Sequence, residues 1–234
     1  MKLAIVGYGK MGRLVEQFAP EYDFKAALKL DEFNNVNFRA IVPENFAGIR
    51  VAIEFSTPET AVENIERIAA LGVHMVVGTT GWLAQLDRVK SIVEKRNIGL
   101  VWSPNFSIGV NVFNRVVAEA ARLLAAEAEY GAWAWEIHHD AKKDAPSGTL
   151  LKLVEEMKRA GYARPVDVGS NRAGRHPGTH EIGFDSAADT ITLRHTARSR
   201  EGFARGALKA ARWIAGRKGI FEFSDVLFNS ASGG

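Results

Sequence analysis

Apolar residues in the first half of the chain gather in short runs that are separated by stretches of helical periodicity. The runs read as buried strands and cover Lys2–Val6, Phe24–Leu30, Val51–Ser56, His74–Val77 and Ile98–Trp102. Between them, helices are predicted to begin near Met11 and at Thr57-Pro58-Glu59, and to cover Leu83–Lys95. Strands that alternate with helices predict a parallel sheet with helices on both faces, an α/β arrangement.

The pattern changes after Phe106, which suggests a second domain. The elements expected there are a helix from about Gly109 to Ala126, a strand over Trp133–Ile137, a helix from Ser147, strands His180–Phe184 and Thr190–Thr196, and a helix from about Phe203 to Ala215. The strands alternate apolar and polar positions, which favours an α+β domain with an open mixed sheet. We expect residues 1–106, completed by 201–234, to form one domain and residues 107–200 the other, with the small-residue tail Ser230 to Gly234 frayed.

A glycine-rich turn directly follows the first strand. Gly7, Gly9 and Gly12 have the Gly-x-Gly-x-x-Gly spacing, with Lys10 and Met11 between the last two, and a helical pattern follows. In this setting the spacing predicts a pyrophosphate at the helix N-terminus and hence a Rossmann-type dinucleotide-binding domain; the alternative is a plain glycine turn. Ligands of such sheets lie at the carboxyl ends of the strands, where we expect Phe55, Gly78, Thr79, Thr80, Ser103, Asn105 and Phe106 to bind the cofactor.

The end of the second predicted strand carries residues that discriminate between cofactors. Asp31 is the nearest acidic residue for a ribose 2′-hydroxyl, as in NADH binding. Lys29 stands just before it and could pair with a 2′-phosphate, so the sequence leans toward NADPH without excluding NADH. A solvated Lys29 with no role in binding stays open.

The segment from Glu136 to Thr149 collects candidate catalytic residues. His138 and His139 end a predicted strand and point to opposite faces, so only one of them easily faces a given ligand. Lys142 follows in a loop, and Ser147, Gly148 and Thr149 open a helix whose free backbone N–H groups suit a carboxylate or phosphate. Each feature alone is more often structural. Together, an imidazole, an ammonium and an anion site suit proton transfer on a small acidic substrate.

Composition narrows the class of protein. The 234 residues are 47% hydrophobic and 24% charged, as in a soluble globular protein. The net charge of +3 is dispersed, which gives little support for nucleic acid binding. The absence of cysteine excludes disulfides and thiolate zinc sites, and fits a cytoplasmic location. We expect no metal centre, no secretory signal and no membrane span, since Ile68–Leu86 is uncharged but too polar to cross a bilayer.

On several of these motifs the chain resembles the 4-hydroxy-tetrahydrodipicolinate reductase (dihydrodipicolinate reductase) family over nearly its whole length. The motifs are the glycine turn, Gly78-Thr79-Thr80-Gly81, Ser103-Pro104-Asn105-Phe106-Ser107, the Glu136 to Thr149 segment and the ending Gly219 to Leu227. The stretch from His138 to Thr149 is the most diagnostic, whereas the glycine turn occurs in many dehydrogenases.

The resemblance implies an NAD(P)H-dependent oxidoreductase of diaminopimelate and lysine biosynthesis. It would transfer a hydride to C4 of a cyclic unsaturated dicarboxylate, with loss of water from 4-hydroxy-tetrahydrodipicolinate. The resemblance makes His138 the acid/base residue and Lys142 its partner, and gives substrate binding to His139, Lys142, Ser147, Gly148 and Thr149. A homotetramer is expected, for which the open sheet face offers an interface.

The chain departs from the family pattern in two respects, and two other interpretations stay open. It is shorter than typical members, and Lys29 stands where many relatives have an acidic residue. A different nicotinamide-dependent reductase, such as an aspartate dehydrogenase-like enzyme, is disfavoured by the Asp144 to Thr149 signature. A non-catalytic nucleotide-binding regulator would need neither His138 nor Lys142. A cluster of arginines is interpreted mainly as a solvent-exposed corner between a strand and a helix: Arg194, Arg198, Arg200 and Arg205.

Overall fold

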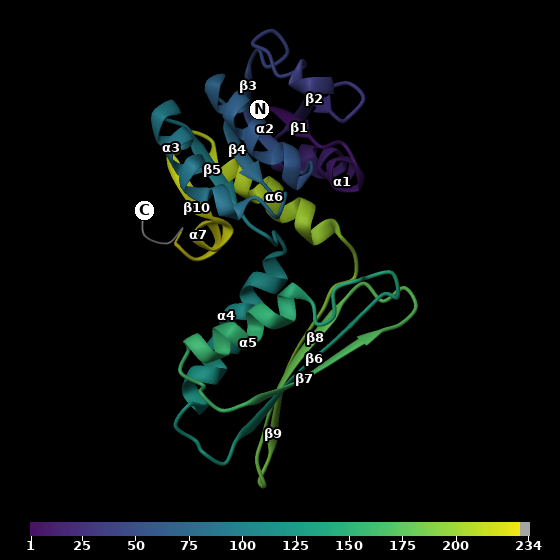
Figure 1. Ribbon diagram of the computed structural model, residues 1–234, viewed down its shortest axis with the longest axis vertical. Coiled ribbons are helices and arrows are strands. Elements are labelled where there is room, and N and C mark those ends of the chain that lie inside the picture. Colours follow the sequence, from purple (N-terminus) through teal and green to yellow (C-terminus); the bar gives the residue numbers. More distant parts are fainter. Residues whose placement is uncertain (230–234) are drawn as a thin grey trace. The chain divides into compact units, whose positions relative to one another are not determined.

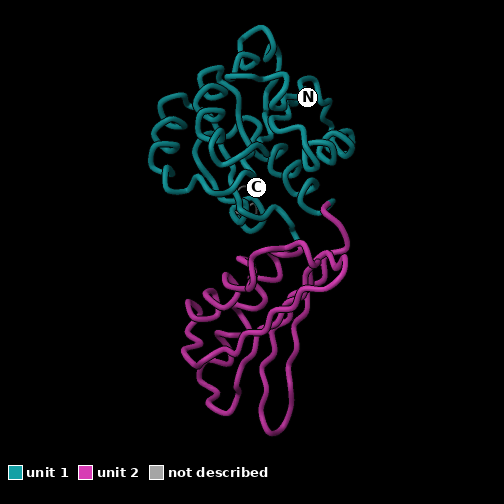
Figure 2. Tube along the Cα trace, turned by 45° about the vertical axis from the view of Figure 1, so that its right-hand side comes forward, with its two compact units in different colours: residues 1–108, 201–234 teal, residues 109–200 magenta. Residues whose placement is uncertain are grey.

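The computed structural model describes residues 1–229 and divides the chain into two compact units (Figure 2). Unit 1, drawn in teal, comprises Met1–Ile108 and the segment that begins at Glu201; unit 2, in magenta, comprises Gly109–Arg200. The tail for which fraying is expected lies outside the described residues. Within residues 1–229, every helix is too short or too polar to cross a lipid bilayer.

Unit 1 is built on a parallel sheet of six strands (Figure 1). Its strands lie in the order β10-β5-β4-β3-β1-β2 and are β1 (Lys2–Val6), β2 (Lys25–Leu30), β3 (Ile49–Glu54), β4 (His74–Val77), β5 (Gly99–Trp102) and β10 (Gly219–Glu222). The central strands are buried on both faces, which explains their nearly continuous apolar sequences. The predicted α/β sheet of Rossmann type is confirmed.

Helices cover both faces of this sheet. The helices of unit 1 are α1 (Lys10–Phe18), α2 (Pro58–Ala70), α3 (Leu86–Arg96), α6 (Glu201–Ile214) and α7 (Phe223–Phe228), with short 3-10 turns at Ala19–Tyr22, Val36–Phe38 and Leu83–Gln85. Apolar residues of α2 and α3 pack on one face, and those of α1 and α6 on the other. The chain therefore needs its C-terminal segment to complete the core of unit 1.

Unit 2 packs two helices on one face of a mixed four-stranded sheet. The strand order is β7-β6-β8-β9, for β6 (Gly131–His138), β7 (Val166–Arg172), β8 (Thr179–Asp185) and β9 (Thr190–Thr196). β6 and β7 are parallel, and the other neighbours are antiparallel. Figure 1 shows α4 (Ile108–Leu124) and α5 (Gly148–Arg159) along this sheet, where Phe113, Val117, Leu150, Leu153 and Met157 meet Ala134, Ile182 and Phe184.

Two strands of the structure were not predicted from the sequence pattern. β7 reads VDVGSNR, with too few apolar residues to be predicted as a strand, yet it hydrogen-bonds along the whole of β6. β10 has only four residues and lies at the edge of the sheet beside β5. In both, tertiary pairing outweighs weak local preference.

Candidate active site

Alternate side chains of β6 face the interior of unit 2, and two of them are polar. Ala134, Glu136 and His138 alternate along the buried face of the strand, with His138 8% exposed and Glu136 completely buried. The bulkier residues Trp133 and Trp135 lie on the other face, so the buried face of this strand carries the titratable side chains and the open face carries the aromatic rings.

The Glu136 carboxylate is the centre of a hydrogen-bond network. Its Oε1 accepts from the Ser147 backbone N–H at 2.8 Å, from Ser170 Oγ at 2.8 Å and from Arg172 Nη2 at 2.9 Å. Its Oε2 accepts from the Ser147 hydroxyl. Burial alone raises the pKa of Glu136, but the hydrogen bonds from Ser147 and Arg172 outweigh it and hold the pKa at about 2. Glu136 is therefore an ionised group inside the unit.

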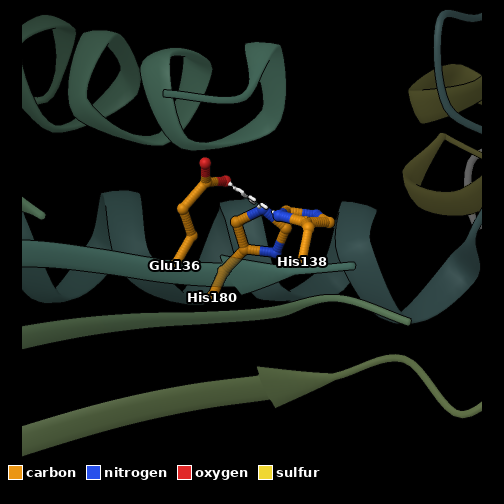
Figure 3. Close-up of side chains that lie close together, drawn as sticks. All are labelled: Glu136, His138 and His180. Atoms are coloured by element: carbon orange, nitrogen blue, oxygen red, sulfur yellow. Dashed lines mark ion pairs between the residues drawn. The ribbon is translucent and has the colours of Figure 1, made fainter. Parts of the chain in front are cut away.

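Two imidazoles face the same carboxylate (Figure 3). His138 Nδ1 lies 3.4 Å from Glu136 Oε2, and His180 Nε2, from β8, lies 3.3 Å from the same oxygen. The two rings stand edge to face, with centroids 5.1 Å apart. Burial lowers the pKa of His180 to about 4, helped by the neighbouring His138. Burial also lowers the pKa of His138, while the negative charge of Glu136 opposes that shift.

Glu136, His138 and His180 offer three ligand atoms within 4.8 Å of one another, so a metal ion must be considered. Both carboxylate oxygens already accept hydrogen bonds, and the Arg172 guanidinium supplies the compensating positive charge. The hydrogen bonds and the arginine charge therefore compensate the Glu136 carboxylate without a cation.

The loop between β6 and α5 brings Lys142 to this network. Lys142 Nζ lies 2.6 Å from Asp144 Oδ1, and this ammonium is the main reason for the lowered pKa of Asp144. Arg172 Nε donates to the Lys142 carbonyl at 3.2 Å, and Arg172 Nη2 donates to the Asp144 carbonyl. The arginine that pairs with Glu136 thus also fixes the loop that carries Lys142.

The remaining predicted substrate-binding residues surround the start of α5. Ser147 is the N-cap, because its Oγ accepts from the Leu150 N–H at 3.3 Å while its hydroxyl contacts Glu136. Gly148 is exposed and Thr149 is half-buried at the first turn. His139 follows the end of β6 and is half-buried, and its carbonyl accepts from the Lys142 N–H. The Ser147 hydroxyl is already engaged within the unit, so the backbone start of α5 is the more available anion site.

Sequence reasoning gave no role to Glu136 and missed His180, Ser170 and Arg172. Ser170 and Arg172 lie on the unpredicted β7, and a single glutamate between apolar residues on β6 resembles a solvent-facing position. The register of β8 places His180 directly opposite Glu136, a pairing that no local spacing reveals.

In unit 1, the glycine turn fits a dinucleotide. Gly7 has φ +94°, and a Cβ there would lie 2.1 Å from the Phe55 carbonyl oxygen; a Cβ on Gly12 would lie 2.5 Å from the Gly7 carbonyl oxygen. Neither position accepts a side chain, so the backbone of this turn is accessible to a ligand. Directly after it, α1 begins at Lys10 with Gly9 as its N-cap and Met11 in its first turn. A pyrophosphate needs this close backbone approach.

The other predicted cofactor residues form three neighbouring loops of unit 1. Phe55 follows β3 and its ring fills the space beside Gly78, where β4 has ended. Gly78 precedes Thr79 and the exposed Thr80. After β5, Ser103 Oγ and Asn105 exchange hydrogen bonds within a turn, and the Phe106 ring is buried against Phe55 and Phe223.

Lys29 is paired in the structure. Its Nζ lies 2.9 Å from Glu16 Oε1 and 5.3 Å from the centre of the Tyr8 ring, and the Tyr8 hydroxyl also donates to Glu16. Asp31 Oδ1 accepts from the N–H groups of Phe33 and Asn34. Of the arginine cluster, Arg194 pairs with Glu181 in unit 2 and Arg205 with Glu21 in unit 1.

Comparison with known proteins gives a consistent result over both units. Family models described as dihydrodipicolinate reductase, N-terminus and C-terminus, match residues 1–106 and 109–227. A 4-hydroxy-tetrahydrodipicolinate reductase of Christiangramia forsetii is 35% identical over 97% of this chain and 98% of its own. One of Archaeoglobus fulgidus is 34% identical over 97% of this chain and all of its own.

Solved structures share the fold. A dipicolinate-bound dihydrodipicolinate reductase from Paenisporosarcina sp. TG-14 has a TM-score of 0.81 and 22% identity, covering 96% of this chain and 98% of its own. An aspartate dehydrogenase from Thermotoga maritima has a TM-score of 0.50 and 13% identity, covering 92% of this chain and 96% of its own, so that likeness concerns the fold alone.

Proposed function

Because this chain belongs to the dihydrodipicolinate reductase family, it is an NAD(P)H-dependent reductase of 4-hydroxy-tetrahydrodipicolinate in diaminopimelate and lysine biosynthesis, and we propose that His138 and Lys142 carry its proton transfer. The reaction consumes substrate, NAD(P)H and one proton, and yields tetrahydrodipicolinate, NAD(P)⁺ and water. The observation that supports the residue assignment is the network through which Glu136, Ser147 and Arg172 join His138, the Lys142 loop and the start of α5.

The roles follow from the chemistry of these groups. The reduced nicotinamide supplies the hydride when it is bound. His138 lies at the end of β6 and, when protonated, donates the proton that balances the electron density left on the ring. Lys142 places a positive charge beside that density. His139, Lys142, Ser147, Gly148 and Thr149 bind the substrate carboxylates, mainly through the first turn of α5 and the lysine ammonium.

For the cofactor we favour NADPH. The bare backbone at the glycine turn receives the pyrophosphate, and the loops with Phe55, Thr79, Thr80, Ser103, Asn105 and Phe106 surround the nicotinamide end. Lys29 would leave Glu16 to pair with a 2′-phosphate. We expect Lys29→Ala to lower kcat/KM with NADPH by about 10-fold or more and to spare NADH, since a charged hydrogen bond contributes about 1.5–3 kcal/mol. Equal losses with both nucleotides would exclude this role.

Other interpretations have less support. The match of both family models argues against an aspartate dehydrogenase-like reductase, and the connected His138 and Lys142 argue against a regulator without chemistry. A homotetramer assembled through the open sheet face and a cytoplasmic location complete the proposal.

The test is a coupled assay in which aspartate semialdehyde and pyruvate are condensed in the same cuvette and nucleotide oxidation is followed. We expect turnover with at least one nucleotide. His138→Gln and Lys142→Ala are each expected to lower kcat by at least ~100-fold while nucleotide affinity stays near that of the wild type. If either variant instead loses nucleotide binding, the proton-transfer site has been misplaced.

A further inference from the structure

We propose that Glu136 is a positioning residue that holds His138 through Nδ1 and couples its charge to the Lys142 loop and the start of α5. The inference rests on the proposed function, in which His138 donates the proton, and it assigns a role to a group that does not itself contact substrate.

The first argument is that Glu136 does more than stabilise the fold. A fully buried carboxylate is costly unless hydrogen bonds and an opposite charge compensate it, and Ser147, Ser170 and Arg172 do so. Oε2 nevertheless also faces His138, whose Nδ1 is buried and has no hydrogen-bond partner. The Glu136 oxygen 3.4 Å away is thus positioned to accept from Nδ1–H after a small rotation of the ring.

The second argument concerns which nitrogen of His138 is left for chemistry. A proton fixed on Nδ1 by a carboxylate leaves Nε2 as the titrating atom. The Nε2 edge lies against Gly178, where a Cβ would come within 2.9 Å of Nε2. The absence of a side chain at Gly178 leaves room at that edge, so carboxylate and glycine act on opposite sides of the ring.

The third argument is electrostatic. The charged or titratable groups that face His138 are Glu136 on β6, His180 on β8, Arg172 on β7, and Lys142 and Asp144 in the loop. Burial, Lys142 and Arg172 disfavour the imidazolium, whereas the carboxylates favour it, and Glu136 contributes most among them. Without the charge of Glu136, His138 would lose its proton at a lower pH.

The experiment compares Glu136→Gln, Glu136→Asp and the wild type in two measurements. In the coupled assay we expect Glu136→Gln to lower kcat by about 10–100-fold, the range for groups that orient a reacting side chain, with nucleotide KM unchanged. Activity should fall with rising pH as His138 deprotonates, and this fall should move to lower pH by at least ~0.5 unit in Glu136→Gln. Glu136→Asp keeps the charge and should recover most of the original profile.

The second measurement is an NMR titration of the His138 imidazole in the substrate-free protein, which does not depend on turnover. The pKa of His138 should fall in Glu136→Gln and recover in Glu136→Asp, with Nδ1 protonated in the neutral wild-type ring. The control is Ser170→Ala, which removes a hydrogen bond to Oε1 and leaves Oε2 facing His138, so its pH profile should match that of the wild type.

The outcomes separate this inference from the proposed function. An unchanged His138 pKa in a folded Glu136→Gln variant, or a uniform loss of rate with no shift of the profile, would show that Glu136 is merely structural. A wild-type protein without turnover would remove the function, while the titration would still decide whether Glu136 and His138 are coupled.

Discussion

His138 depends on one neighbour from its own strand and on two that are distant in sequence. Glu136 comes from the same strand, His180 from β8, and Gly178 from the turn before β8. The local pattern of titratable residues beside a helix start drew attention to the two adjacent histidines, and the family resemblance selected His138 as the candidate. The local pattern could not identify the other three, since their roles arise only when strands pair in the observed register.

Gly178 offers a direct test at the scale of one residue. Its φ is +137°, and a Cβ would press on the His138 ring. We expect Gly178→Ala to lower kcat by about 10–100-fold, because small displacements of a reacting group have effects of this size. The control is Gly174→Ala, a position with φ +53° and open space around it, where kcat should change less than about 3-fold. Equal effects at both positions would point to backbone strain alone.

Glu54, at the end of β3, gives a prediction about pH and stability. It is fully buried, and burial raises its pKa despite hydrogen bonds from Ser56. A carboxyl with a raised folded-state pKa stabilises the protein below its unfolded-state pKa, and this contribution is lost as pH rises through the folded-state pKa. Glu54→Gln should therefore raise the melting temperature at pH 8 by about 2–4 °C per kcal/mol recovered and have little effect at pH 4. A larger gain at pH 4 would contradict the assigned shift.

At the scale of elements, periodicity predicted most strands and helices but not their lateral partners. β1, β3 and β4 are continuous apolar runs because both faces are buried. β7 lacks that signal, although it supplies Ser170 and Arg172 to the site. The predicted helix over Leu83–Lys95 is a 3-10 turn followed by α3, a boundary that apolar spacing alone does not mark.

The start of α5 offers a test at the scale of one element. Ser147 both caps the helix and donates to Glu136, so Ser147→Ala should cost about 1–2 kcal/mol and lower the melting temperature by several degrees at pH 7. Loss of that donor also raises the pKa of Glu136. Because a depressed pKa stabilises above the unfolded value and is lost as pH falls, acid unfolding of the variant should begin at higher pH.

The control is Thr57→Ala at the start of α2, where the side chain makes no capping hydrogen bond, and a smaller change is expected. Thermal and acid unfolding followed by circular dichroism provide the measurements. An acid transition of Ser147→Ala at the wild-type pH would argue against coupling between the cap and the carboxylate.

At the scale of the whole molecule, the open face of the unit 2 sheet is the main unexplained surface. Trp133 and Trp135 are only half-buried there, and their rings occupy the space beside Gly183 and Gly169. Sequence alternation indicated that one face is open, but it assigned no partner. A second copy of the chain would cover these rings in the proposed homotetramer.

Trp135→Glu tests this surface. If this face is the interface, a charge at its centre should convert the proposed tetramer into smaller species at micromolar concentration, as measured by size-exclusion chromatography with light scattering. Leu123→Glu is the control, because this residue is 59% exposed on α4, which packs on the other face of the sheet. A wild-type monomer, or an equal effect of both variants, would rule out the sheet face as the interface.

The division of the chain also has a consequence for biosynthesis. Unit 2 is one continuous segment, whereas unit 1 is completed only by α6, β10 and α7, which are synthesised after unit 2. Apolar residues of α1 and of the sheet that pack against α6 have no cover until about residue 214 has emerged. We expect unit 2 to fold during translation, before unit 1 is complete. A nascent chain stalled before Glu201 would therefore contain a folded unit 2 and an incompletely folded unit 1.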